Sequence, residues 1–138
     1  MSRRVIRVKD IMHQSYCRLD GRTTVTQAVQ TVRDSGAQAV VVDKRHDDDE
    51  FGLVLLSDVA KKVMAKNRAP DRVSLYEIMA KPVVAVRPAM DVRYCARLFH
   101  HFGLGCAPVM EGEEIVGLVG YRELVLDGLW TETEGELA

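Results

Sequence analysis

Two acidic residues occupy the same place behind two glycine-led apolar segments. Asp58 comes six residues after Gly52 in GLVLLSDV, and Glu123 comes six residues after Gly117 in GLVGYREL. An ionised carboxylate has two acceptor oxygens, so each acid can accept hydrogen bonds from backbone amides or from a bound molecule. The helix dipole also favours an acid in a first helical turn, and Ser57 can cap the same turn. A structural role and a binding role are therefore both open for these acids.

A second group of polar residues, KRHDDDE at 44–50, places His46 beside four acids. Carboxylates and imidazole bind divalent metals, but the spacing does not match a calcium-binding loop. We interpret the segment as a charged hairpin tip that keeps a sheet edge soluble. His100 and His101 are adjacent, so on a helix they diverge by about 100° and do not form one bidentate site. No metal site is predicted.

The three cysteines, Cys17, Cys95 and Cys106, form no C-x-x-C pair. An odd number without that spacing argues against a disulfide framework and against a zinc site, so we interpret them as small packing residues. No nucleophile elbow, phosphate-binding loop or H-E-x-x-H sequence is present. We therefore predict no catalytic residues and no enzymatic activity.

The composition limits the range of partners. The 138 residues include 19 basic and 20 acidic side chains, for a net charge of −1, which argues against a field that holds duplex nucleic acid. The basic start, SRRVIRVK, is too short to change that expectation. No apolar run is long enough for a membrane span or a signal peptide. We expect a soluble, cytoplasmic protein that binds neither nucleic acid nor membrane.

The helices and strands that must position the two acids occur twice in the sequence. A shift of 67 residues, falling to 65 after a shorter hairpin, superimposes the two halves. The matching pairs are Ile11 and Ile78, Met12 and Met79, Val25 and Val92, Gly36 and Gly103, Val42 and Val109, and Gly52 and Gly117. Duplication at this period predicts two similar units, which we place at residues 1–66 and 67–130, with a flexible polar tail at 131–138.

Each copy follows the same order of elements. Thr24 and Gln27 form a capping pair ahead of an apolar stripe that stops at Gly36, and Asp91 and Gly103 bound the matching helix. β-Branched runs then predict strand pairs at 39–43 with 51–56 and at 106–110 with 115–120. A final helix closes each copy, with Val59, Ala60, Val63 and Met64 facing the core of the first and Leu124, Val125, Leu129 and Trp130 facing that of the second.

A strand, helix, strand pair and helix in each copy predict an α/β fold of the α+β type. Each unit is then a small sheet with two packed helices. One such unit buries little apolar surface alone, so the copies are expected to pack about a pseudo-twofold axis.

This pattern resembles tandem CBS domains, the cystathionine β-synthase-type pair that forms a Bateman module. The resemblance is carried by VKDIM and LYEIM, by AVVVD and APVME, and by GLVLLSDV and GLVGYREL, and it spans about residues 5–128. It implies a regulatory, non-catalytic module that binds adenosine-containing ligands in clefts between the units and pairs into homodimers.

For the two acids, the resemblance implies contacts with both ribose hydroxyls. Two carboxylate oxygens match the two donors of a vicinal diol. The sequence departs from the family pattern at Leu55 and Gly120, where a threonine or serine often meets the phosphate. Lys81 and Arg122 are the alternative sources of positive charge, together with Arg97, His100 and His101.

The resemblance also implies which residues lie against the base. They are Ser15, Tyr16, Cys17, Gln38 and Val40 in one cleft, and Pro82, Val83, Val84, Cys106 and Pro108 in the other. Backbone amides there can read the adenine edge while apolar side chains cover its faces, although the same apolar residues also suit a plain core.

The expected function is to sense AMP, ADP, ATP or a related molecule, with or without magnesium, and to signal occupancy to an effector protein. No cofactor is required. The alternative is a ligand-free dimerisation or protein-docking module. Leu55 and Gly120 favour the alternative, whereas Asp58 and Glu123 favour ligand binding.

Overall fold

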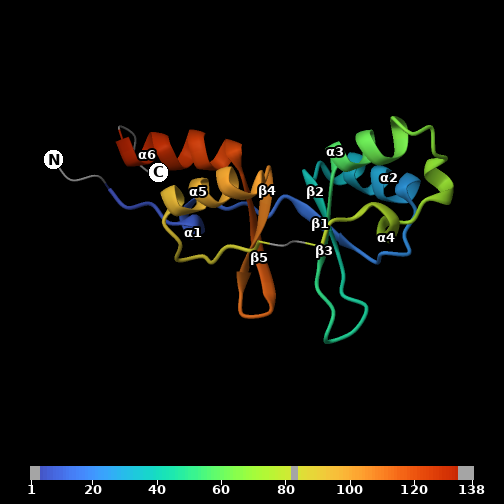
Figure 1. Ribbon diagram of the computed structural model, residues 1–138, viewed down its shortest axis with the longest axis horizontal. Coiled ribbons are helices and arrows are strands. Elements are labelled where there is room, and N and C mark those ends of the chain that lie inside the picture. Colours follow the sequence, from blue (N-terminus) through green and yellow to red (C-terminus); the bar gives the residue numbers. More distant parts are fainter. Residues whose placement is uncertain (1–3, 82–83, 134–138) are drawn as a thin grey trace. The chain divides into compact units, whose positions relative to one another are not determined.

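The computed structural model describes residues 4–81 and 84–133, which form parts of two compact units (Figure 1). One unit comprises residues 15–83 and is called the continuous unit. The other combines residues 1–14 with 84–138 and is called the split unit. Within the described ranges, no helix has the length and apolar character needed to cross a membrane.

The continuous unit has a three-stranded sheet in the order β1-β2-β3. β1 runs parallel to β2, and β3 runs antiparallel to it. Its elements are β1 (Tyr16–Leu19), α2 (Val25–Ser35), β2 (Ala39–Val42), β3 (Gly52–Leu55), α3 (Leu56–Val59), η1 (Ala60–Met64), η2 (Pro70–Arg72) and α4 (Leu75–Ile78). α3 and η1 follow one another without a break and form one helix over residues 56–64.

The split unit has the antiparallel pair β4-β5, and Val86 adds a parallel bridge to Val109 where the other unit has β1. Its elements are α1 (Val8–Ile11), α5 (Val92–Phe102), β4 (Cys106–Glu111), β5 (Glu114–Gly120), η3 (Glu123–Leu129) and α6 (Trp130–Thr133). Mixed helices and small sheets in both units confirm the predicted α+β class.

The strand pairs of the two units have the same register. Ala39 pairs with Leu55 in the continuous unit, and the repeat-related residues Cys106 and Gly120 pair in the split unit. The duplication found in the sequence is therefore also present in the hydrogen-bonded sheets.

The opening segment of each sequence copy packs with the glycine-led strand of the other copy. His13 exchanges two backbone hydrogen bonds with Leu118, and Ala80 exchanges two with Leu53, at 2.8–2.9 Å. The compact units are therefore composed differently from the sequence copies at 1–66 and 67–130. His13 bridges to the edge of β5 in the split unit, and Ala80 bridges to the edge of β3 in the continuous unit.

The glycines that begin these strands give the opening segments room to pack. A side chain at Gly52 would collide with the Met79 sulfur, and a Cβ at Gly117 would lie 2.8 Å from the Met12 sulfur. The methionine of each repeat thus packs against the first strand glycine of the other repeat.

The two long helices begin and end as the sequence predicts. The Thr24 hydroxyl accepts a hydrogen bond from the Gln27 amide at 3.2 Å, and the Asp91 carboxylate accepts one from the Arg93 amide at 2.8 Å. Gly36 and Gly103 follow with left-handed φ angles of 72° and 64°. These helices form because both ends of each are satisfied by the predicted residues.

The predicted inward stripe of the last helix is wrong. Leu124 is buried, but Val125, Leu129 and Trp130 are 43–56% exposed, and Gly128 packs against Val92 instead. Residues 123–129 form a π-helical segment, whose larger number of residues per turn rotates the buried face away from the position that α-helical spacing predicts. The same applies to Met64, which is the last residue of the π-helical segment η1 and is 70% exposed.

The predicted flexible tail begins too early at 131. Thr131 and Glu132 belong to α6 and are buried, and the Arg93 guanidinium donates a hydrogen bond to Glu132. Residues 134–138 lie outside the described ranges.

Each unit has its own hydrophobic core. In the continuous unit it lies between α2, the sheet, η1 and α4, and in the split unit between α1, α5, the β4-β5 pair and η3. The core of the continuous unit contains Val25, Ala28, Val40, Val42, Val54, Val63, Val73, Leu75 and Ile78. The core of the split unit contains Ile6, Val8, Ile11, Val86, Val92, Cys95, Phe99, Ala107, Val109, Val119 and Leu124.

Candidate functional site

The candidate site of the continuous unit lies at one end of its sheet. Tyr16, Ala39 and Leu55 are in register across β1, β2 and β3, so two strands begin where the third ends. The Gln38 amide donates a hydrogen bond to the Ser15 carbonyl at 2.8 Å just before the strands begin. The topology therefore brings these segments together at the strand end that leads into the helix carrying Asp58.

Asp58 is fixed to that sheet end by the backbone. Its Oδ2 accepts a hydrogen bond from the Leu55 amide at 2.9 Å, and its Oδ1 lies 3.5 Å from the Lys62 ammonium. The side chain is 20% exposed. The hydrogen bond to Oδ2 thus orients the carboxylate, while Oδ1 faces the Lys62 ammonium. A carboxylate has more lone pairs than these two contacts use, so it can still accept hydrogen bonds from the hydroxyl groups of a ligand.

The other predicted residues of this unit differ in accessibility. Tyr16 and Cys17 are half-buried, Gln38 and Ser57 are exposed, and Val40 is a buried core residue. Burial raises the pKa of the Cys17 thiol, which lies 3.9 Å from the Ala39 carbonyl. The side chain of Val40 therefore packs in the hydrophobic core of this unit.

The split unit repeats the arrangement with Glu123. Gly120, in register with Cys106 at the sheet end, donates its amide hydrogen to Glu123 Oε1 at 2.8 Å. His13 Nε2 lies 3.7 Å from the same oxygen. Glu123 is only 6% exposed, so the longer side chain is folded against the protein more closely than Asp58.

Of the remaining candidates of the split unit, Cys106 lies close enough to this acid to be affected by its charge. Burial, and then the Glu123 charge, raise the pKa of the Cys106 thiol to about 11. Pro108 is buried, and its carbonyl accepts a hydrogen bond from the Val86 amide at 3.0 Å. Val84 is half-buried, whereas the predicted contacts Pro82 and Val83 lie outside the described residues.

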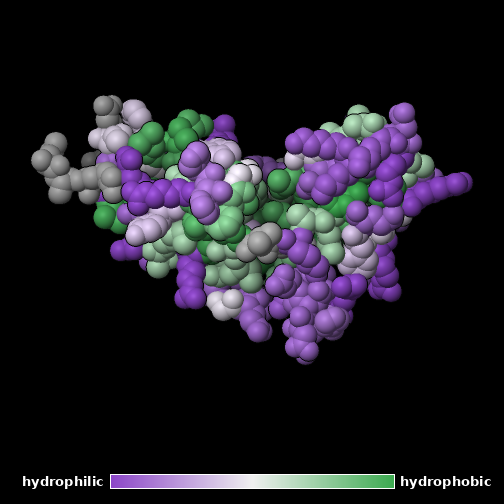
Figure 2. Space-filling model, in the orientation of Figure 1, coloured by the Kyte–Doolittle hydropathy of each residue, from purple (hydrophilic) through white to green (hydrophobic). Residues whose placement is uncertain are grey.

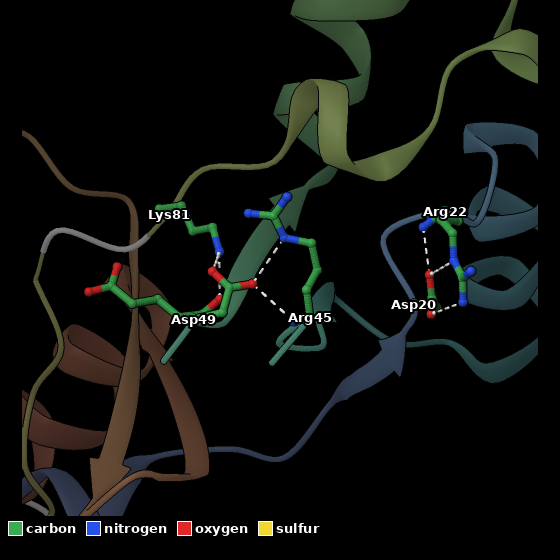
Figure 3. A network of polar contacts seen from close by, with 6 residues as sticks. Asp20, Arg22, Arg45, Asp49 and Lys81 are labelled. Carbon is green, nitrogen blue, oxygen red and sulfur yellow. Dashed lines mark hydrogen bonds and ion pairs between the residues drawn. The ribbon is translucent and has the colours of Figure 1, made fainter. Parts of the chain in front are cut away.

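Lys81 belongs to a different polar network, formed with the β2-β3 hairpin (Figure 3). Its ammonium donates hydrogen bonds to Asp49 Oδ1 at 2.5 Å and to the Glu50 carbonyl at 2.7 Å. Asp49 Oδ2 also accepts from the Arg45 amide at 2.9 Å. The Lys81 hydrogen bond, followed by that of the Arg45 amide, holds the pKa of Asp49 well below its usual range. Lys81 thus holds the β2-β3 hairpin in place through Asp49 and Glu50.

The other predicted cations lie on helix surfaces. Arg122 is exposed and has no hydrogen-bond or ion-pair partner within residues 4–81 and 84–133. Arg97, His100 and His101 line a surface hollow of about 660 Å³ on α5, to which Glu123 does not contribute. Among the residues that the structure describes, no group of three or more histidine, cysteine or acidic side chains could hold a metal ion.

Two residues at the site were not predicted from the sequence. Lys62 follows Asp58 by four residues, a helical spacing that can be recognised in the sequence. His13 approaches Glu123 only because its segment pairs with β5, a long-range contact with no local signal.

Comparisons with known proteins agree with this architecture. The profile of the CBS domain family matches residues 75–126. The hexameric CBS-CP12 protein from bloom-forming cyanobacteria is 32% identical and superimposes with a TM-score of 0.86, over 96% of this chain and 77% of that one. The CBS domain pair of a protein crystallised with 5′-methylthioadenosine and S-adenosyl-L-methionine shares the fold, with a TM-score of 0.74 at 18% identity, over 89% of this chain and 95% of that one.

An uncharacterised protein of Methanopyrus kandleri is 24% identical over 103 residues, which cover 74% of this chain and 52% of that protein. The chain thus spans about half the length of this curated relative. The duplicated sheets, the shared register and the similarity over nearly the whole length lead to one conclusion: the chain belongs to the CBS domain family and is a tandem CBS pair.

Proposed function

We propose that this tandem CBS pair is a non-catalytic regulatory module that binds an adenosine-containing ligand, such as AMP, ADP, ATP or a related nucleoside, and signals its occupancy to a partner protein. The observation that carries the proposal is the acid built at the same place in both units. In each, one carboxylate oxygen accepts the amide hydrogen of the last strand residue. The acid is thereby pre-oriented before any ligand arrives, which lowers the cost of binding.

The ligand class follows from the donor and acceptor pattern. A carboxylate held at a sheet end is suited to the two hydroxyls of a ribose, and the Gln38 and Tyr16 segments lie at the same sheet end. A related domain pair of the same fold has been crystallised with two adenosine derivatives, which supports the same ligand class here.

Signalling requires that the ligand bind one conformation better than another. Occupancy of such a site then shifts a conformational population or a partner affinity. The effector protein is a separate molecule in this proposal.

The proposal is tested by thermal unfolding with adenosine, AMP, ADP, ATP and S-adenosylmethionine, each with and without magnesium. A ligand at 100 times its dissociation constant should stabilise the fold by about 2.7 kcal/mol. Absence of stabilisation by every ligand at millimolar concentration would instead favour a role in dimerisation or protein docking.

A second candidate function, dimerisation or protein docking, is favoured by the exposed apolar surface of the split unit. Figure 2 shows hydrophobic residues over the helix formed by η3 and α6. The large exposed side chains there are Tyr121, Val125, Leu126, Leu129 and Trp130, with Tyr94 and Phe102 on α5. Exposed apolar groups of this extent are typical of interaction surfaces. We propose a homodimer, which a monomer mass in sedimentation at micromolar concentration would contradict.

A further inference from the structure

The two candidate sites differ at one charged position of the repeat. The shift of 65 residues that places Asp58 on Glu123 also places Lys62 on Asp127. Each residue follows its acid by four positions, close to one turn in both the α-helical and the π-helical parts of these helices, so the repeat places each on nearly the same side of the helix as its acid. One unit therefore has a cation where the other has an anion.

Lys62 is held at the acid by a second contact. Its ammonium donates a hydrogen bond to the Ile78 carbonyl at 2.9 Å while lying 3.5 Å from Asp58 Oδ1. The side chain remains 42% exposed. An ammonium group has three donors, so one is available to a ligand anion after these two contacts. Lys62 also compensates the charge of Asp58, which leaves the site electrically neutral before a ligand binds.

Within the described residues of the split unit, no lysine or arginine pairs with Glu123. Asp127 is exposed, and no ion pair with it occurs within residues 4–81 and 84–133. His13 lies near Glu123 but carries a charge only when protonated. Arg122 immediately precedes Glu123 and points about 100° around the helix from it. Two acids on one face therefore repel an anionic ligand group.

We propose that the two units select adenosine ligands of different charge. The continuous unit takes a ligand with a 5′ phosphate, with Lys62 as the residue that determines this specificity. The split unit takes a ligand whose 5′ substituent is neutral or cationic. This inference rests on the proposed function, since it assumes that both acids bind ribose; the 5′ substituent is then carried by the sugar that each acid holds.

The test measures AMP and adenosine affinities by calorimetry on the full chain, one site at a time. Glu123→Gln disables the split-unit site and Asp58→Asn disables the other, with little change in side-chain size. In the Glu123→Gln background, AMP should bind more tightly than adenosine. Lys62→Gln should weaken AMP binding by about fivefold to tenfold, as expected for one charge-assisted contact, and leave adenosine unchanged. Lys61→Gln is the matched control and should change neither affinity.

In the Asp58→Asn background, adenosine should bind more tightly than AMP, and Asp127→Lys should reverse the order. Added salt should weaken only AMP binding to the continuous unit. Equal AMP and adenosine affinities at both sites, or AMP binding to the split unit that depends on Arg122, would overturn the charge selectivity but leave the proposed function intact. No binding of either probe to wild-type protein would overturn both.

Discussion

The replacement of Asp58 by alanine separates the structural and binding roles of this acid. The carboxylate accepts one backbone hydrogen bond, from Leu55, and faces Lys62 across 3.5 Å. Loss of a hydrogen bond costs about 0.5–1.5 kcal/mol, and an ion pair between helical residues four positions apart adds about 0.3–0.5 kcal/mol. We therefore expect Asp58→Ala to lower the free energy of unfolding by about 1–2 kcal/mol while the fold persists.

The expected effect on ligand binding is of a different kind. Loss of hydrogen bonds from ribose hydroxyls to a charged acceptor costs about 1.5–3 kcal/mol, which corresponds to about a tenfold to hundredfold weaker affinity. Calorimetric titration with AMP measures this affinity, and chemical unfolding measures the stability of the same preparation.

Glu77→Ala provides a matched control in the same unit. Glu77 accepts a hydrogen bond from the Ser74 amide at 2.8 Å and pairs with Arg68 at 2.8 Å, so it has the same helix-capping duty at α4. We expect Glu77→Ala to reduce stability and leave AMP affinity unchanged. If Asp58→Ala and Glu77→Ala reduce stability but both leave affinity unchanged, Asp58 is a helix cap only and our reasoning about the ribose contact is refuted.

Three further outcomes follow from the packing and the charges. Gly52→Ala should destabilise the fold by about 1–3 kcal/mol because the added methyl group overpacks against Met79. Met79→Ala in the same chain should recover part of that loss, as measured by chemical unfolding. If the two substitutions instead lower stability additively, the contact between these residues is contradicted. Cys106, whose pKa is about 11, should be alkylated at pH 8 about a hundredfold more slowly in the native than in the unfolded protein, and equal rates by mass spectrometry would be inconsistent with its burial. Because the pKa of Asp49 is lowered in the folded state, its stabilising effect should be complete above the usual aspartate pKa of about 4 and be lost as the pH falls below that value. The difference in stability between wild type and Asp49→Asn should therefore shrink in acid. A difference that does not depend on pH would argue against a stabilising contact between Asp49 and Lys81.

The local features of this fold can be read from the sequence. The caps at Thr24 and Asp91 and the stops at Gly36 and Gly103 lie where predicted, because each depends on residues only a few positions apart. The duplication likewise predicts the common register of the strand pairs.

The features that could not be predicted depend on long-range packing. The exchange of opening segments places His13 beside Glu123, although these residues are far apart in the sequence. The π-helical segment at 123–129 turns Val125, Leu129 and Trp130 outward, and α-helical spacing gives no indication of it. Lys81 pairs with Asp49 through a hairpin whose path the sequence does not define.

The most direct test of the proposed binding sites is an amide NMR titration of the intact chain with adenosine and with AMP. Our account predicts that the largest shift changes occur at the two sheet ends, around Leu55 to Asp58 and around Gly120 to Glu123, and that they saturate as the ligand binds. Shift changes confined to α5, η3 and α6, or no saturable change at millimolar ligand, would contradict the claim that these acids form adenosine sites.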